Sequence, residues 1–226
     1  MALLTRGSKI TQRNPLLQAC RHLAKTDQVL GGFISRIGPC GLRPRRQYFL
    51  VLCDSIISQQ LSLSAASTIF DRYVALYPHQ IPTPEAVLRT RPSILRAVGL
   101  SRRKVEYLHA LAAAFDDGSI VMRTLVRKPN EAIIAHLTAI RGIGQWTAEM
   151  FLIFALHRLD VLPASDLGIQ KAIQQGYRLS ALPAPCTLEQ FGRHWHPYES
   201  VACWYLWHSL ALPEQDIQQR SLSCQQ

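Results

Sequence analysis

The stretch from residue 137 to residue 173, LTAIRGIGQWTAEMFLIFALHRLDVLPASDLGIQKAI, limits the fold more than any other part of this chain. The end of an apolar helix leads into a turn built on Gly142, Ile143 and Gly144, and a second helix rich in apolar residues follows. A short loop that contains proline then places Asp166 at the start of a third helix. The pattern predicts a helix, hairpin, helix unit followed by a carboxylate.

The rest of the chain is also expected to be helical. Apolar residues recur at helical spacing, Gly and Pro interrupt them, and no alternation typical of a strand lasts more than a few residues. We therefore predict an all-α protein of roughly ten helices, with a Pro-rich connection at residues 182–187. Outside the central stretch, helices are expected over residues 15–25, from 27 onward, 47–63, 64–76, 85–88, 92–98, 101–115, from 130 onward and 197–210.

The helix expected over residues 101–115 begins with three basic residues. Arg102, Arg103 and Lys104 occupy its first turn, where positive charge opposes the helix dipole. We expect an anionic group nearby that relieves this conflict.

The composition favours a globular protein with a polyanionic partner. Of the 226 residues 48% are hydrophobic, which is enough for a substantial core, and no apolar run reaches the roughly 18 residues of a membrane span. Lys and Arg outnumber Asp and Glu by 25 to 15, and the resulting charge of +10 suits nucleic acid or an acidic membrane surface. Charge alone does not choose between these partners. Arg43, Arg45 and Arg46 form a basic cluster that is either a solvated loop or a DNA contact.

Cysteine and histidine are not arranged as metal ligands. The cysteines lack the close pairings that structural zinc or an iron–sulfur cluster requires. His194, His196 and His208 have no Cys, Asp or Glu partners at ligand spacing. We expect no bound metal at these residues, and reduced, mostly buried thiols. The cysteines stand at positions 20, 40, 53, 186, 203 and 224.

The N-terminal end is set apart by its charge. Met1 to Thr26 contains five basic residues and no acidic residue. We expect residues 1–14 to be a flexible tail ahead of a single domain that covers residues 15–226. The segment is interpreted as a short basic tail, with a transit peptide as the alternative.

Three separated motifs resemble, in their order, the helix-hairpin-helix superfamily of DNA base-excision glycosylases, and within it the 3-methyladenine DNA glycosylase II branch of alkylation-repair enzymes. They are GIGQWTAEMF, then LPASDLGIQKA with Asp166, then PYESVACWYLW at residues 197–207. Weaker similarity at residues 55–67 and 99–112 extends the resemblance over most of the chain from residue 27 onward. The hairpin alone is more typical of an ordinary helix connection, so the combination carries the resemblance.

The resemblance implies a two-lobed helical fold with the active site in the cleft between the lobes. One lobe would cover residues 47–157, including the hairpin at 137–157. The other would combine residues 15–46 with residues 158–226. We expect only this helical core, without the extra N-terminal sheet domain of the longer alkylation-repair enzymes.

The resemblance further implies that Asp166 is the catalytic carboxylate of a DNA glycosylase. Breaking an N-glycosidic bond builds positive charge on the sugar, so a fixed carboxylate beneath C1′ stabilises the transition state more than the ground state. Asp166 can also orient or deprotonate the attacking water. Ser165 and Asp166 equally suit the N-cap of a helix, a role that is compatible with catalysis.

Trp146 stands where the bifunctional members of the superfamily carry a Lys that forms a Schiff base. Without that amine, covalent catalysis at this position is not available. We predict a monofunctional glycosylase of base excision repair that flips and hydrolytically removes alkylated purines such as 3-methyladenine and 7-methylguanine, leaving an abasic site. The alternatives are a glycosylase for deaminated or mismatched bases and a non-catalytic hairpin module that binds DNA.

Aromatic side chains are expected to select the base. The target base has to leave the stack, and a cationic alkylated base is attracted to electron-rich rings by roughly 0.5–2 kcal/mol. Core packing is the alternative for each ring. The residues assigned to the base pocket are Trp146, Trp207, Tyr198 and Trp204.

The hairpin is expected to hold the DNA backbone, because N–H groups at a helix N-terminus bind phosphate without base preference. Gln59, Gln60 and Leu61 fall where the family places the residue that fills the gap left by the flipped base, with a plain polar helix end as the alternative. The resemblance also implies a monovalent cation at the hairpin carbonyls, and we expect no other cofactor. The full set of expected DNA contacts is Arg141, Gly142, Ile143, Gly144, Gln145, Thr147, Lys171, Gln59, Gln60 and Leu61.

Surface charge without a DNA contact is the alternative for Arg141 and Lys171. Glu199 departs from the family, in which Arg commonly follows Pro and an aromatic residue, so we assign no equivalent of that Arg contact. We expect a monomer without membrane attachment whose partner is double-stranded DNA with a damaged base. Its location would be the cytoplasmic nucleoid of a bacterium or the nucleus of a eukaryote.

Overall fold

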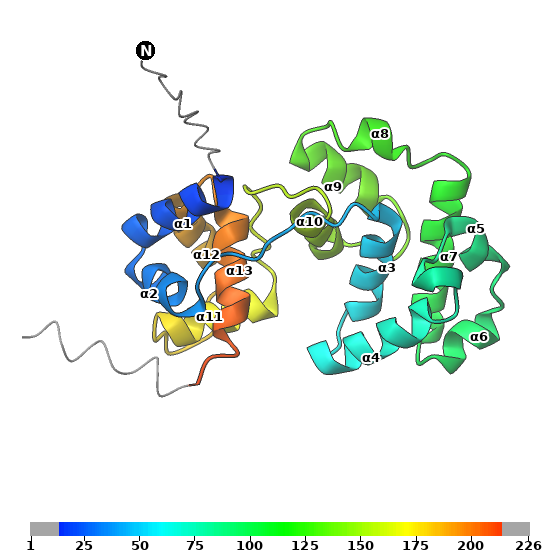
Figure 1. The fold of residues 1–226 in the computed structure, drawn as a ribbon, viewed down its shortest axis with the longest axis horizontal. Helices are drawn as coiled ribbons and strands as arrows, with labels where there is room; N and C mark the ends of the chain where they lie inside the picture. The colour runs from blue at the N-terminus through cyan, green and yellow to red at the C-terminus, as the bar shows by residue number, and fades with distance from the viewer. Residues whose placement is uncertain (1–13, 214–226) are drawn as a thin grey trace, which may run out of the picture.

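The computed structural model describes residues 14–213, and over this range the protein is all-α without strands, as predicted. The flexible tail predicted for residues 1–14 lies almost entirely outside the described residues. Figure 1 shows the arrangement of the helices. They are α1 (Pro15–Thr26), α2 (Gln28–Ile37), α3 (Tyr48–Ser58), α4 (Leu63–Val74), the 3₁₀ turn η1 (Pro78–Gln80), α5 (Pro84–Arg89), α6 (Pro92–Ala97), α7 (Arg102–Asp116), α8 (Met122–Leu125), α9 (Asn130–Thr138), α10 (Gln145–Phe154), α11 (Leu167–Gly176), α12 (Pro185–Trp195) and α13 (Glu199–Ser209).

Side chains cap many of these helices. Asn14, Ser62, Thr83 and Ser101 accept hydrogen bonds from backbone N–H groups in the first turns of α1, α4, α5 and α7. Each cap satisfies a donor that the helix itself leaves without a partner. The helices therefore begin where short polar residues stand in the sequence.

The prediction of a Pro-rich connection at residues 182–187 is wrong in its second half. Pro185 occupies the first turn of α12 instead of ending a helix. Proline is tolerated there because its missing N–H would have no intrahelical partner. Residues 185–195 therefore form a helix that was not predicted, and the described residues contain more helices than the roughly ten expected.

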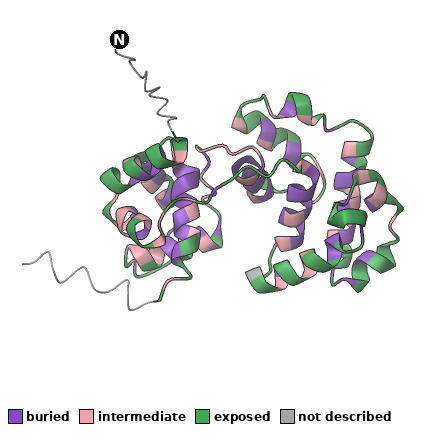
Figure 2. Ribbon diagram, in the orientation of Figure 1, coloured by how far each residue is buried: buried purple, intermediate pink, exposed green. Residues whose placement is uncertain are grey.

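Buried side chains form two separate clusters. The first draws on α3 to α10 and runs from Leu42 to Val161, slightly beyond the 47–157 range expected for that lobe. The second draws on α1, α2 and α11 to α13. In Figure 1 α1, α2 and α11 to α13 lie on the left and α3 to α9 lie on the right. Figure 2 shows buried positions along the facing sides of the helices in both groups.

The two clusters meet at a few shared side chains. Leu159, Trp204 and Trp207 are half-buried and pack against both clusters. α13 also contacts α1, α2, α11 and α12. This helix is therefore the central element of the second cluster, and it presents Trp204 and Trp207 to the first.

The charge conflict at the start of α7 is relieved mainly by another helix end. The Lys104 ammonium donates to the carbonyl oxygens of Ile57 (2.7 Å) and Gln59 (2.8 Å), at the C-terminal end of α3. Those carbonyls carry the negative end of the α3 dipole. Arg102 pairs with Glu106 at 3.3 Å on the same helix.

None of the helices between residues 14 and 213 is long and apolar enough to cross a membrane. Among the five cysteines in this range, Cys20, Cys53 and Cys203 are buried, Cys40 is half-buried and Cys186 is exposed, and all five are free thiols. Burial raises the pKa of Cys40 to about 11 and the pKa of Cys53 to about 12.

Candidate active site

Asp166 caps α11 and is almost completely buried, with 8% of its surface exposed. Its Oδ1 accepts the backbone N–H of Ile169 at 2.8 Å. The capping role considered for Asp166 is therefore present. A capped carboxylate has a fixed orientation, which a catalytic charge requires.

Two indole N–H groups also bind this carboxylate. Trp146 Nε1 donates to Oδ2 at 2.6 Å, and Trp207 Nε1 donates to Oδ1 at 3.0 Å. The donors come from α10 and α13, one from each cluster. Asp166 thus accepts three hydrogen bonds, and because an ionised carboxylate has about four lone-pair sites, Oδ2 keeps one free.

The four residues assigned to the base pocket are not equivalent in the structure. Trp207 stacks on Phe154 with ring centroids 5.7 Å apart, next to its bond with Asp166. Tyr198 packs instead against His22 of α1, at 5.3 Å. Trp204 stacks on His208 at 3.8 Å and lies against Gly41. The geometry therefore groups Trp146 and Trp207 around the carboxylate, whereas Tyr198 packs against α1 and Trp204 packs between the two clusters.

The hairpin has the tight turn that the sequence predicts. Gly142 has φ +94°, and a Cβ at this position would stand 2.1 Å from Cγ of Tyr107. Only glycine fits both the backbone conformation and this close approach. Ile143 is buried and anchors the turn, while Gly144 precedes α10 and has open space beside it.

Gln59 holds this turn from the end of α3. Its Nε2 donates to the carbonyl oxygen of Gly142 (2.9 Å) and to the hydroxyl of Thr147 (3.0 Å). Thr147 is 1% exposed, so its side chain faces the interior of the protein, and the DNA contact assigned to this position stays a prediction. Gln59 and Thr147 therefore stabilise the hairpin through hydrogen bonds on its inner side.

Gln60 and Leu61 have a different setting from Gln59. Both are exposed, and Gln60 adopts the left-handed backbone conformation with φ +57°. Strained backbone of this kind tends to occur at functional sites. Of the three candidates for filling the gap left by a flipped base, the structure thus favours Gln60 and Leu61.

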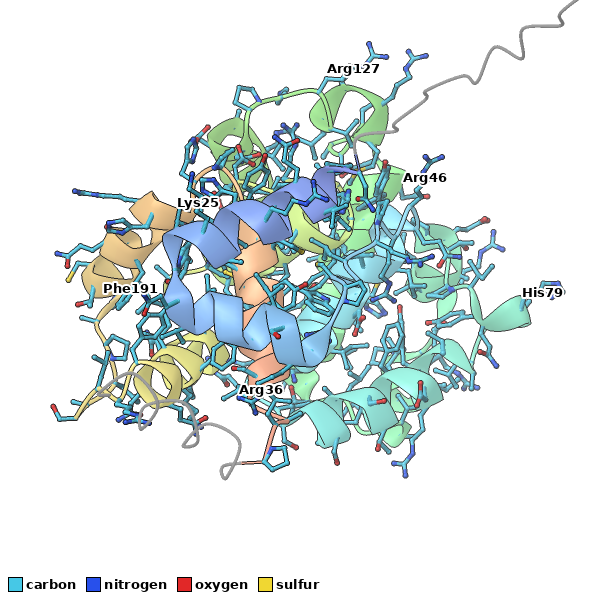
Figure 3. All side chains as sticks on the ribbon, turned by 60° about the vertical axis from the view of Figure 1, so that its left-hand side comes forward. Lys25, Arg36, Arg46, His79, Arg127 and Phe191 are labelled. Atoms are coloured by element: carbon cyan, nitrogen blue, oxygen red, sulfur yellow. The ribbon has the colours of Figure 1, made fainter. Side chains whose placement is uncertain are left out.

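The remaining expected DNA contacts lie on the surface. Arg141 is exposed and pairs with Glu106 at 2.7 Å. Lys171 is exposed on α11, and Gln145 is exposed at the first position of α10. In the basic cluster before α3, Arg45 pairs with Asp54 at 2.8 Å, while Arg46 points away from the body of the molecule (Figure 3).

One buried acidic residue near Asp166, Glu149, was not predicted from the sequence. Glu149 is 4% exposed, and its Oε1 accepts the side-chain N–H of Gln145 at 2.9 Å. Burial, together with the nearby charge of Asp166, raises the pKa of Glu149. A signal was present, since Glu149 is the only charged residue in the apolar sequence of α10.

Glu199, the departure from the family pattern, is also buried. Its Oε1 bonds to His196 Nδ1 at 2.9 Å. Cys203 lies close to Glu199, Glu149 and Asp166, and burial followed by these three charges raises the pKa of its thiol well above the usual value. Residues 14–213 contain no group of three or more His, Cys, Asp or Glu side chains that could hold a metal ion.

The hairpin, the capped carboxylate and the two helical clusters define a class of protein. The chain belongs to the HhH-GPD superfamily of base excision DNA repair proteins, whose family model matches residues 53–197. The motif-based resemblance is thereby confirmed at the level of the family.

Individual relatives are similar over nearly the whole chain. A DNA-3-methyladenine glycosylase of Schizosaccharomyces pombe is 34% identical over 88% of this chain and 90% of its own. A solved structure of 3-methyladenine DNA glycosylase from that organism, in complex with abasic DNA, superposes with a TM-score of 0.82 and covers 87% of this chain and 98% of that one. A DNA-3-methyladenine glycosidase from Bacillus halodurans is 36% identical over 87% of this chain and 89% of its own, with a TM-score of 0.71.

Proposed function

We propose that this protein is a monofunctional DNA glycosylase that flips alkylated purines, such as 3-methyladenine and 7-methylguanine, out of duplex DNA and removes them by hydrolysis. The observation that carries the proposal is the buried Asp166 carboxylate, held by the Ile169 N–H and two indole N–H groups. The names of the relatives, which are DNA-3-methyladenine glycosylases, support the same substrate class.

The fixed carboxylate suits the charge that develops during base release. As the N-glycosidic bond breaks, positive charge builds on the sugar, and a preorganised anion stabilises it without reorganising. The free lone pair on Oδ2 is the one that can face the sugar or a water molecule. An alkylated purine already carries positive charge and leaves easily, so a strong general acid is not required.

The lyase step is absent in this proposal because of Trp146. Its indole N–H donates to Asp166 Oδ2 at 2.6 Å, at the position where the bifunctional relatives carry the Schiff-base Lys. An indole nitrogen is a donor without a nucleophilic lone pair. Hydrolysis then ends at an abasic site in an unbroken strand.

In this proposal the hairpin binds the phosphate backbone of the DNA. The α10 N-terminus has no side-chain cap, so its first N–H groups are available to a phosphate oxygen. Gln60 or Leu61 would fill the gap left by the flipped base. A monovalent cation at the hairpin carbonyls stays a prediction, and base release measured in K⁺ and in a bulky organic cation tests it.

A set of duplexes, each with one lesion, tests the function. We expect release of 3-methyladenine and 7-methylguanine, no release of uracil or hypoxanthine, and strand breaks only after alkali treatment. Release of a deaminated base alone would change the substrate class. Strand breaks without alkali would show a lyase, and salt-dependent binding without any free base would leave only a DNA-binding module.

A further inference from the structure

Glu149 connects the DNA-facing start of α10 with the neighbourhood of Asp166. It stands one helical turn after Gln145, whose side-chain N–H it accepts at 2.9 Å. It also stands three positions after Trp146, which donates to Asp166. Residues at these spacings share one side of a helix, so one buried side chain adjoins both contacts.

The second oxygen of this carboxyl group is buried without a hydrogen-bond partner. Glu149 Oε2 is among the buried side-chain atoms between residues 14 and 213 that have none. A buried, unpaired negative charge is far more costly than a buried neutral carboxyl group. The interacting ionisable groups, Asp166 at the start of α11 and Cys203 of α13, bring no positive charge, and the pKa of Glu149 is raised accordingly.

We infer that Glu149 is a positioning residue: in its protonated form it fixes the Gln145 amide at the start of α10, where the hairpin meets DNA. A protonated Glu149 also leaves Asp166 without a second negative charge beside it. One N–H of the Gln145 amide is then held by Glu149, and the other stays available for a phosphate oxygen. The inference rests on the proposed function, because Gln145 has this role only if the hairpin holds DNA.

The test compares variants in base release from methylated duplex DNA. Glu149→Ala removes the acceptor, and we expect KM to rise roughly fivefold, the loss of one hydrogen bond, with kcat unchanged. Glu149→Gln keeps a carbonyl acceptor and mimics the protonated acid, so it should restore KM to within about twofold of the wild type. Gln145→Ala should match Glu149→Ala, and the double variant should be no worse than either single one.

The matched control is Glu131→Ala, a glutamate on the exposed side of α9, which should leave KM and kcat unchanged. Thermal unfolding of each variant confirms that it folds. If Glu149→Gln raises KM as much as Glu149→Ala, the charged carboxylate is needed and the inference is wrong. Additive effects of the two alanine variants would also overturn it. A wild type that releases no methylated base would instead contradict the proposed function itself.

Discussion

Asp166 shows how a few polar atoms define a site inside a helical protein. One carboxylate oxygen caps α11 and binds Trp207, while the other binds Trp146. Each donor restricts the carboxylate further. The neighbouring Gly168 completes this arrangement, because a Cβ there would stand 3.0 Å from Asp166 Oδ1 and 3.2 Å from Trp207 Cδ1.

Gly168→Ala is therefore expected to lower the activity without lowering the stability of the protein. The added methyl group would push the carboxylate and the indole apart by a few tenths of an ångström, and we expect kcat to fall roughly tenfold. Alanine favours the helix over glycine, so the melting temperature should stay the same or rise. Steady-state kinetics and thermal unfolding of the same preparation measure both effects. A variant with unchanged kcat would mean that the bond from Trp207 does not matter for the reaction.

At the scale of single elements, the end of α3 positions the hairpin. From the sequence, Gln59 and Gln60, with Leu61 as a third candidate, all fall where the family places the residue that fills the gap left by the flipped base. The structure separates them: Gln59 faces the hairpin with two hydrogen bonds, whereas Gln60 and Leu61 are exposed. The Lys104 ammonium stabilises the same end of α3 by donating hydrogen bonds to the last carbonyl oxygens of that helix.

Gln59→Ala is expected to loosen the hairpin without touching Asp166. Two hydrogen bonds of about 1 kcal/mol each are lost, so the affinity for a duplex should fall by up to roughly thirtyfold while kcat at saturating DNA stays near the wild-type value. Fluorescence anisotropy with a labelled duplex measures the affinity. Gln18→Ala, an exposed glutamine on α1, is the control. An equal loss in the control or a loss confined to kcat would argue against this role.

The second lobe has a comparable anchor in Asp27. Its Oδ1 caps α2, and its Oδ2 accepts the Tyr177 hydroxyl and the Trp195 indole N–H, which ties α2 to α11 and α12. Asp27→Ala leaves those buried donors without an acceptor. We expect the free energy of unfolding to fall by about 2–4 kcal/mol, measured by urea denaturation, whereas Asp71→Asn on the exposed side of α4 should have little effect. A loss below about 0.5 kcal/mol would show that the network does not hold the lobe together.

Much of the fold and part of the site follow from the sequence, for physical reasons that differ between elements. The turn at Gly142 and Ile143 and the helix cap at Asp166 can be predicted from the sequence, because both are local features. The hydrogen bonds from Trp146 and Trp207 to Asp166 cannot be predicted from the sequence, since they depend on how α10 and α13 face each other. The burial of Thr147 could not be predicted, because the hairpin motif does not show which side of α10 faces the core. Glu149 is missed because an apolar helix suggests a uniform core.

At the scale of the whole molecule, the formal charge of +10 favours binding to a polyanion. Lys171 is exposed on α11, close in sequence to Asp166, and Arg46 projects from the surface (Figure 3). Arg89 pairs with Glu85 on α5, at the opposite side of the molecule from α11 (Figure 1). Substitutions at these three residues therefore compare the effect on DNA binding of surface charges at different places on the molecule.

Salt dependence distinguishes charges that contact DNA from charges that do not. The logarithm of the binding constant for DNA falls linearly as the logarithm of the salt concentration rises. Each lost phosphate contact decreases the steepness of this fall by about 0.9. We expect this decrease for Lys171→Gln and none for Arg89→Gln. Arg46→Gln decides whether the basic cluster before α3 is a DNA contact or a solvated loop. An unchanged slope for Lys171→Gln would remove that residue from the DNA interface.

We propose above all that the carboxylate of Asp166 drives removal of an alkylated base. The most direct measurement is chromatography of the bases released from methylated duplex DNA by the wild type and by Asp166→Asn, with duplex binding measured in parallel. The asparagine keeps the helix cap but lacks the charge. We predict that the wild type releases 3-methyladenine and 7-methylguanine, and that the variant binds the duplex and releases neither. Release by Asp166→Asn at the wild-type rate would contradict this role of the Asp166 carboxylate.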